Sequence, residues 1–422
     1  MATAPFWIRS TFTQAARARL APAAPAASLR VVAGREVEAA RRPVAEALGV
    51  EEMAPFIADW ADLVSRAIEP NGFLEPGFAL EAARHFPARS RPQFVLVWKG
   101  AVGAGRRLVA LFPIVAPGLA LGGATTRGWL HKQAALATPL LDRDCAEEAA
   151  AALIDWLARH SPGAGAILFP TLPISGPAFA ALAHAALATG RGWRVLDRRE
   201  RAVLLPGGDP AELWTRNGSG KALSELRRRR RRLAEAGELK RRIYSDPAEI
   251  PAATEAFLAL EASGWKAKRG ALLGHPSLAT FVRSATRLLA RERKCAIHSL
   301  ELDGRPVAMG VVIESGGRSY FWKIAYDEDW RPQAPGVQLV FAITETQTAR
   351  AEIDMTDSCA LPGHVMIERA WPERLAVCDL MIQTDAHAPA RFNAACAAEK
   401  TRRRLRAMAK KALYRMLRRK ER

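Results

Sequence analysis

A glycine opens a predicted helix shortly after a predicted strand, and this arrangement can bind an anion. The strand covers 318–326, a loop covers 327–335, and Gly336 begins a helix of about 336–350. Free backbone N–H groups at a helix start bind phosphate, and the helix dipole favours the negative charge. Pro335 suits this position because its missing N–H costs nothing there. The stretch Ala-Pro-Gly-Val is also compatible with an ordinary helix entry that binds nothing.

Three side chains that can take up a proton follow this helix. Asp354 and Asp357 lie on and just after a predicted strand, 353–356, and His364 lies beyond it. A carboxylate or an imidazole within reach of an amine or hydroxyl can orient that group and remove its proton. We expect Asp354 to orient a reacting group and Asp357 or His364 to act as the base. The alternative for each is a capping or loop role.

Residues on neighbouring elements are candidates for binding a substrate. Lys323 alternates with apolar residues along its strand, so it faces either a cleft or solvent. Trp265 and Lys266 lie between two predicted helices, and Trp265 suits a core anchor or a stacking surface. Glu261 precedes Trp265 by one helical turn and either lines a cleft or caps a surface. Arg230 falls on the apolar side of its helix, so we expect it to have a carboxylate or phosphate partner.

Several motifs with well-defined chemistry are absent. Gly218-Ser-Gly-Lys221 lacks the first glycine of a phosphate loop, and Ala222 stands where a serine or threonine must bind magnesium. H-E-x-x-H, G-x-S-x-G and a strand-linked G-x-G-x-x-G do not occur. The five cysteines are widely spaced and form no C-x-x-C pair. The sequence therefore supports neither a disulfide framework nor a zinc site, and we expect no metal.

Hydrophobic patterning predicts two α/β units separated by Pro206-Gly-Gly-Asp-Pro210. In the first unit we expect strands at Phe94–Trp98, Leu108–Val115, Ala166–Phe169 and Trp193–Leu205, and helices at Ala149–Ala158 and Phe179–Ala188. In the second we expect helices at Lys221–Ala236, Ala248–Ala262, Pro276–Glu292 and Gly336–Arg350, and strands at Leu239–Tyr244, Cys295–Leu302, Val307–Glu314, Arg318–Tyr326, Ile353–Thr356 and Leu375–Ile382. Asp303-Gly304 and Gly316-Gly317 predict tight hairpin turns.

The charge of the 422-residue chain is concentrated at its ends. Lys and Arg number 62 and Asp and Glu 43, giving a net charge of +19 that favours anionic partners. We expect a disordered basic leader at 1–40, with a targeting segment as the alternative. The predicted domains then follow at 45–206, 211–388 and 389–422. The stretch 108–126 is uncharged but interrupted by Pro and Gly, which favours a strand and a loop over a membrane span.

The C-terminal segment predicts a basic amphipathic helix. Residues 399–422 hold twelve Lys and Arg against two Glu, a net charge of +10. Leu405, Met408, Ala412, Leu413, Met416 and Leu417 recur at helical spacing. Such a helix can lie on an anionic membrane or bind RNA, or it can dock on its own protein through the apolar stripe.

A series of motifs in the second half resembles a known family. The chain reads S-E-L-R-R-R-R-R-R-L-A-E-A-G over 224–237, L-E-A-S-G-W-K-A-K-R-G over 260–270 and L-D-G-R-P-V-A over 302–308. Next come Y-F-W-K-I-A-Y-D-E-D-W over 320–330 and A-P-G-V-Q-L over 334–339. In this order the motifs resemble GNAT-superfamily acyltransferases of the cellulose-biosynthesis (CelD/BcsL) type, which are related to Fem-type transferases.

The resemblance implies an α/β fold of two tandem GNAT-like units, the first degenerate, each a mixed, mostly antiparallel sheet flanked by helices. It also implies acyl transfer from acetyl-CoA to a polar acceptor such as a saccharide or a cell-envelope precursor. The residues that then contact the donor are Lys323, Ala325, Gln333, Gly336, Val337 and Gln338. Gln338 departs from the family pattern, which has a small residue there, and the family's D-F-x-x-G and Y-K are only partly kept after Asp354.

Three functions stay open on the sequence alone. The first is a cytoplasmic acyltransferase that uses acetyl-CoA, with peripheral contact at the inner face of the membrane as an option. The second is a Fem-type transferase that uses aminoacyl-tRNA, which the Arg-rich helix 221–236 suits. The third is a GNAT-fold protein without catalysis that binds RNA or membrane through its basic helices.

Overall fold

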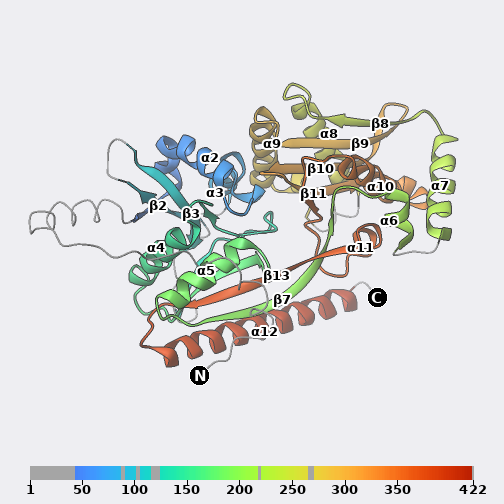
Figure 1. Cartoon of the computed structure of the whole chain (residues 1–422). Coiled ribbons are helices and arrows are strands. Elements are labelled where there is room, and N and C mark those ends of the chain that lie inside the picture. The colour runs from blue at the N-terminus through green and yellow to red at the C-terminus, as the bar shows by residue number, and fades with distance from the viewer. Residues whose placement is uncertain are drawn as a thin grey trace, which may run out of the picture. The chain divides into compact units, whose positions relative to one another are not determined.

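One mixed β-sheet runs through both halves of the chain (Figure 1). The computed structural model describes residues 43–86, 91–100, 105–115, 124–216, 220–264 and 270–420, with side chains described up to 412. The order of its main strands is β1-β2-β3-β4-β6-β13-β7-β12-β11-β10-β9-β8. Residues 43–422 form one compact unit. The predicted leader at 1–40 lies outside the described residues.

The N-terminal half starts the sheet from one edge. Its elements are β1 (Val44–Leu48), η2 (Val50–Phe56), α2 (Ile57–Arg66), η3 (Gly72–Leu74), α3 (Pro76–His85), β2 (Gln93–Lys99), β3 (Arg107–Val115), β4 (Thr125–Gly128), β5 (Leu140–Leu141), α4 (Ala146–Arg159), β6 (Ala166–Pro173), α5 (Pro177–Ala188) and β7 (Trp193–Leu204). Strands β3 and β6 are almost wholly apolar because both faces of the sheet are covered there.

The C-terminal half repeats this order from the other edge. After α6 (Pro210–Arg216) and α7 (Gly220–Ala234) come β8 (Leu239–Tyr244), α8 (Ile250–Ser263), η6 (Leu272–Gly274), α9 (Pro276–Arg291), β9 (Cys295–Leu302), β10 (Arg305–Ser315), β11 (Arg318–Tyr326), η7 (Glu328–Gln333), α10 (Pro335–Thr348), β12 (Met355–Asp357), α11 (Val365–Ala370) and β13 (Glu373–Gln383). From β1 and from β8 onward, both halves therefore read strand, two α-helices, a run of strands, helix, strand, helix, strand, and the N-terminal run has the short β5 in addition to three strands. The predicted α/β class with two tandem units is confirmed.

The two halves exchange their last strands. β7 of the N-terminal half pairs antiparallel with β12, and β13 of the C-terminal half pairs antiparallel with β6. β7 and β13 also pair with each other, so the exchange closes the sheet between the halves. Figure 1 shows these two long strands running side by side.

The hairpins of the C-terminal half form where the sequence predicts them. Asp303 and Gly304 both have positive φ, 49° and 74°, at the turn between β9 and β10. Gly316 and Gly317, with φ of 52° and 79°, join β10 to β11. Two consecutive positive φ values match the twist of the flanking strands, which is why short hairpins favour Asp-Gly and Gly-Gly. These turns fix the register that presents β11 at the interior of the sheet.

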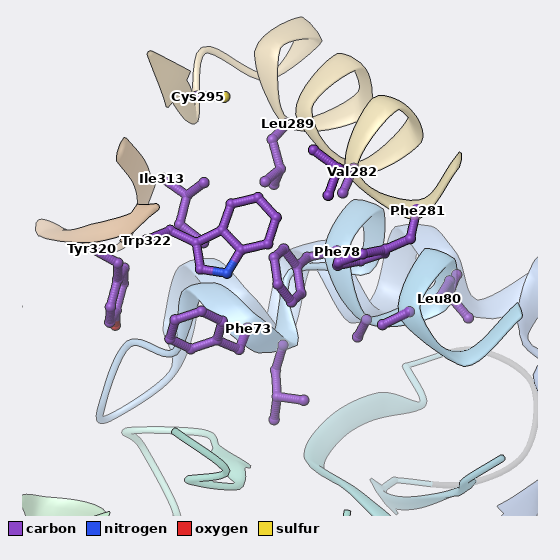
Figure 2. Close-up of a cluster of buried hydrophobic side chains, with 14 of the residues drawn as sticks. Phe73, Phe78, Leu80, Phe281, Val282, Leu289, Cys295, Ile313, Tyr320 and Trp322 are labelled. Carbon is purple, nitrogen blue, oxygen red and sulfur yellow. The ribbon is translucent and has the colours of Figure 1, made fainter. Parts of the chain in front are cut away.

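An aromatic cluster joins helices of both halves under β11 (Figure 2). Phe78 of α3 lies 5.2 Å, between ring centroids, from both Phe281 of α9 and Trp322 of β11. Phe73 packs in the same way on Tyr320 at 5.3 Å. Edge-on aromatic pairs of this kind stabilise a core beyond the area they bury. The cluster packs β11 against the N-terminal half.

The C-terminal helix α12 (Pro389–Lys420) begins on the protein and then leaves it. Its first turns pack Phe392, Ala395 and Cys396 onto a small apolar cluster with β6 and β13. The described side chains from 404 to 412 are all exposed. Within the described part of the chain, no helix is long and apolar enough to cross a membrane.

Candidate active site

A cavity opens where β11 and β12 separate. The two strands run parallel, but they pair only from Arg318–Met355 to Tyr320–Asp357. Beyond Tyr320, β11 continues to Tyr326 while the chain after Asp357 turns away. A cavity of about 640 Å³ lies between the two, closed on one side by the end of α8. A splayed pair of parallel strands leaves one strand edge available to a ligand's polar groups.

The exposed edge of β11 carries two of the predicted donor-binding residues. Ala325 is buried in the cavity wall, and Lys323 lines the same wall. The Lys323 ammonium donates a hydrogen bond to the Gln133 side-chain oxygen and lies 5.2 Å from the centre of the Trp322 ring. Trp322 donates through Nε1 to the Gln133 carbonyl, 2.8 Å away. A loop of the N-terminal half thus fixes both side chains.

The start of α10 lies directly behind this wall. Ala334 precedes the helix in a left-handed conformation (φ 51°), Pro335 is its first residue, and Gly336 is buried. A Cβ atom at Gly336 would lie 3.1 Å from Tyr326, whose side chain lines the cavity. Glycine is therefore needed for the close approach of the helix to β11. Val337 is half-buried and packs on the apolar cluster beneath the helix.

Gln338, the departure from the family pattern, ties the loop to the helix. Its side chain is 3% exposed, and Nε2 donates to the Gln333 carbonyl at 2.8 Å. The side-chain oxygens of Gln333 and Gln338 are buried without a hydrogen-bond partner in the described residues. This region would suit an extended, polar donor such as acyl-CoA. It combines the glycine at the start of α10, two buried side-chain amides and the edge of β11 that does not pair with β12. The predicted donor-binding residues of this loop thus meet around Gly336, behind the cavity wall.

Asp357 is an ion-pair partner and does not line the cavity. Its carboxylate is fully buried and accepts a hydrogen bond from the Arg201 guanidinium of β7. Its second oxygen accepts from the Cys359 backbone N–H at 2.9 Å. Burial opposes the charge on Arg201, but the carboxylate of Asp357 leaves the Arg201 pKa raised. With both oxygens bonded, this carboxylate positions the chain after β12, and the geometry does not support the expected role as a base.

Cys359 lies in the wall of the cavity, and sequence reasoning missed it. Its backbone is left-handed (φ 54°), held by the hydrogen bond to Asp357. Burial raises the pKa of its thiol well above the usual value, and the Asp357 carboxylate adds to this effect. A neutral thiol is a poor nucleophile. Its left-handed backbone and its place in the lining give Cys359 a role in the shape of the wall.

His364 and Glu261 both line the cavity, as their predicted roles require. His364 is exposed at the start of α11, and its imidazole has no hydrogen-bond partner among the described residues. Glu261 is buried near the end of α8, and its Oε2 accepts from the Leu272 N–H at 2.8 Å. An exposed imidazole at the mouth of a cavity can accept a proton and pass it to solvent. Glu261 instead connects α8 to the segment that follows it.

Asp354 lies at the other end of the strand pair. It is exposed beside the Gly316-Gly317 turn, and its backbone N–H donates to the Gly317 carbonyl at 2.7 Å. β12 runs from this end toward the cavity, so the whole strand separates Asp354 from His364. The structure does not bring Asp354 to the cavity, and this placement corrects the expectation that it orients the acceptor.

We expect Asp354→Asn to leave acyl transfer within about twofold of the wild type. The side chain is exposed and remote from the cavity, and such substitutions usually change stability by no more than about 0.5 kcal/mol. Release of CoA from acetyl-CoA with an acceptor that the wild type uses, together with a urea unfolding curve, measures both effects. A tenfold loss of turnover in a normally folded variant would return Asp354 to the mechanism.

The remaining predicted residues lie elsewhere. Arg230 is exposed on α7 and, with Arg227, lines a separate cavity of about 300 Å³ against α10. In the described residues it has no carboxylate partner, whereas its neighbours Arg228 and Arg229 both bind Glu225. This corrects the expected carboxylate partner of Arg230. Trp265 and Lys266 lie outside the described residues.

A second cavity of about 330 Å³ adjoins the first and was not predicted. The two share a wall made of Trp322, Lys323, Cys359, Ala360 and Leu361. Its other wall comes from β7 and from the loop around Lys132 and Gln133. The run Asp197-Arg-Arg-Glu-Arg201 inside a predicted strand was the available signal, because charged residues rarely lie on interior strands without a partner or a ligand.

His131, next to this second cavity, is a neutral aromatic contact. Its ring lies 4.5 Å from Trp129 and 4.7 Å from Phe86, between centroids. Burial lowers its pKa to about 3, and the charge of Lys323 acts in the same direction. It is therefore too weakly basic to accept the proton of an acceptor near neutral pH.

The described residues contain no group of three His, Cys, Asp or Glu side chains that could hold a metal ion. The splayed strands, the glycine-opened helix and the cavity between them all fall within one part of the chain. Residues 220–359 match the family model of the acetyltransferase (GNAT) domain. This segment includes α7 to β12, and so contains β11, the start of α10 and the residues of the shared wall up to Cys359. The match supports acyl transfer and leaves the donor and the acceptor open.

Several solved structures resemble the chain at low sequence identity. FemX is 11% identical, over 77% of this chain and 95% of its own, with a TM-score of 0.48. A tandem GNAT protein from the clavulanic acid biosynthesis pathway is 15% identical, over 82% and 99%, with a TM-score of 0.40. L-PGS from Bacillus licheniformis is 13% identical, over 67% and 84%, with a TM-score of 0.40. At these values the likeness is general. No curated protein sequence matches the chain.

Proposed function

We propose that the protein is an acyl-CoA-dependent acyltransferase, most simply an acetyltransferase, of the cellulose-biosynthesis type. The acceptor in this proposal is an amine or hydroxyl of a polar molecule such as a saccharide or an envelope-polysaccharide precursor. One observation carries the proposal: Tyr326, which lines the cavity between β11 and β12, also packs against Gly336 at the start of α10. A thioester arm needs a strand edge and a diphosphate needs a helix start, and here the two are adjacent.

The roles of the chain's own residues follow from their positions. The start of α10 at Gly336 holds the diphosphate of the donor, and the edge of β11 near Ala325 binds the arm and offers backbone N–H groups to the acyl oxygen. His364 removes the acceptor's proton. The acceptor's nitrogen or oxygen forms a bond to the acyl carbon, the carbon–sulfur bond of the thioester breaks, and the departing sulfur takes up a proton to leave as CoA.

Replacement of His364 by alanine tests its part in the transfer. We expect turnover to fall by roughly 10²-fold, because a positioned base contributes at least that much. The affinity for acetyl-CoA should not change, and added imidazole should restore part of the rate. His387→Ala, another exposed histidine, is the matched control and should behave as the wild type. Unchanged turnover in His364→Ala would remove this residue from the mechanism.

Calorimetry separates the proposed donor from its alternatives. Acetyl-CoA should bind the full chain with one site, and aminoacyl-tRNA and total RNA should not compete with it. Saturable binding of aminoacyl-tRNA without binding of acetyl-CoA would favour a Fem-type transferase. Binding of neither donor would leave a GNAT-fold protein that does not transfer acyl groups.

We further propose that the exposed part of α12 contacts anionic membrane. Leu405, Met408, Ala409 and Ala412 recur at three- and four-residue spacing on one face, and Leu405 and Met408 are 59% and 66% exposed. Arg404, Arg406, Lys410 and Lys411 occupy the rest of the circumference. An apolar face bordered by basic residues is the pattern of a helix that lies in the lipid interface.

Removal of residues 404–422 should reduce binding to vesicles of phosphatidylcholine and phosphatidylglycerol by at least about tenfold, in a salt-sensitive way. The cut is placed after Arg403 because Arg403 binds Asp379 and Glu399, and Glu399 binds Arg127. Within the full chain, Leu405→Ser with Met408→Ser should act in the same direction, and Leu187→Ser, an equally exposed leucine on α5, should not. Vesicle binding that survives the cut would contradict the proposal.

A further inference from the structure

The second cavity has a wall rich in cationic side chains. Lys132, Arg199, Arg201 and Lys323 line it, against one acid, Glu200. The first cavity differs, because most of its lining is apolar side chains such as Leu260, Phe321 and Ile367. The two adjoining cavities are therefore suited to different ligands: the first to an uncharged arm, the second to an anion.

Arg201 forms the fixed part of this wall. It is 6% exposed, and its guanidinium donates to Asp357 and to the Ala135 carbonyl at 3.0 Å. Its Nε is buried and has no hydrogen-bond partner in the described residues. A buried guanidinium N–H without a partner is costly, and a bound anionic oxygen or an ordered water would satisfy it.

Two further cations lie at the same cavity. Arg199 is held by Thr171, which accepts from Nη2 at 2.5 Å, by Asp197, and by Asp379 at 3.6 Å. Lys132 is exposed and forms no ion pair or hydrogen bond with any described residue. Arg199 is thus pre-positioned, while Lys132 can move toward a ligand. This combination is typical of a site that recognises a carboxylate or phosphate group.

We propose that the second cavity binds the acceptor through an anionic oxygen group, a carboxylate or a phosphate. The acceptor's amine or hydroxyl then lies beside Lys323 and Cys359, where the second cavity adjoins the first. This inference rests on the proposed acyltransferase function and names its class of acceptor: an acidic molecule. It also assigns a role in acceptor binding to the N-terminal half, because Lys132, Arg199 and Arg201 all come from that half.

The test measures anion binding directly, without turnover. Inorganic phosphate and succinate are titrated separately into the full chain by calorimetry, at constant ionic strength set with chloride. The titrations use the Gly336→Asp background as well as the wild type, so that a second anion site at the start of α10 is not counted. We expect one saturable site that keeps its affinity in the Gly336→Asp background. The stronger of the two probes indicates whether the natural group is a phosphate or a carboxylate.

Lys132→Gln should weaken this binding roughly fivefold or more, because a charge-assisted contact is lost. Lys132 is exposed, so the variant should fold normally. Lys221→Gln removes the same charge from an exposed position on α7 and should leave the affinity unchanged. The proposal is overturned if neither anion binds saturably, or if Lys132→Gln binds both as the wild type does.

The same samples separate this inference from the function on which it rests. Anion binding that depends on Lys132, without any binding of acetyl-CoA, supports the acidic site and contradicts the acyl-CoA donor. Binding of acetyl-CoA without anion binding at the second cavity supports the donor and contradicts the acidic acceptor.

Discussion

Asp357→Ala should lower the free energy of unfolding by about 3–5 kcal/mol, because it leaves a buried charge without its partner. Arg201 is only 6% exposed, and removal of the carboxylate leaves the Ala135 carbonyl as the remaining hydrogen-bond partner of its guanidinium among the described residues. The same substitution releases the Cys359 N–H and with it the turn that forms the shared wall. A urea unfolding curve, with its midpoint and slope, measures the loss.

Two controls show whether the loss of stability comes from the unpaired charge of Arg201. The double variant Asp357→Leu with Arg201→Met removes both charges and should recover much of the lost stability. Glu225→Ala breaks two exposed contacts to Arg228 and Arg229 and should barely change the unfolding curve. A loss below about 1 kcal/mol for Asp357→Ala would mean that water reaches the pair.

Gly336→Asp should weaken acyl-CoA binding by roughly 10³-fold if the donor lies where we propose. Two like charges 4 Å apart repel by about 4 kcal/mol at the effective dielectric constant of a protein surface, and the aspartate would face the diphosphate at the helix start. Calorimetry with acetyl-CoA measures the change. Normal melting of the variant is the check that the loss concerns binding and not folding.

Gly336→Ala separates the effect of the added charge on affinity from the effect of the added Cβ atom. Its Cβ meets Tyr326 at 3.1 Å, the same contact that the aspartate makes, but it carries no charge. We expect a loss of affinity below about tenfold for alanine, because a neighbouring side chain can yield by a few tenths of an ångström. If the aspartate variant binds acetyl-CoA as tightly as the wild type, the donor does not lie at this helix start.

Local signals in the sequence predicted most elements of the fold. The turns at Asp303-Gly304 and Gly316-Gly317 have positive φ at two consecutive residues, and each residue pair by itself indicates such a turn. β11 was predicted with the bounds it has, Arg318–Tyr326, because its residues alternate and its ends are marked by turns. β1, α2 and α3 were not predicted, and they include the residues that pack against α9 in the aromatic cluster.

The candidate site was predicted less well because it depends on pairing between distant segments. Asp354 and Asp357 look equivalent in the sequence, three residues apart on one predicted strand. Which of them meets Arg201 depends on β12 pairing with β7, from the other half of the chain. The second cavity depends in the same way on the loop around Lys132 packing against Lys323, some 190 residues away in the chain. The hydrophobic periodicity of one segment does not indicate which distant segment it pairs with.

The exchange of β7 and β13 has a consequence for how the chain is made. The ribosome finishes the N-terminal half long before residues 373–383 emerge, and until then β6 lacks its neighbour on one side. A newly made strand with an open edge is a site for wrong pairing between chains. The nascent chain therefore completes its sheet only when β13 has been made, and a fragment that stops before Glu373 leaves the edge of β6 unpaired. Any fusion, truncation or library built on this protein should treat residues 43–422 as one inseparable folding unit.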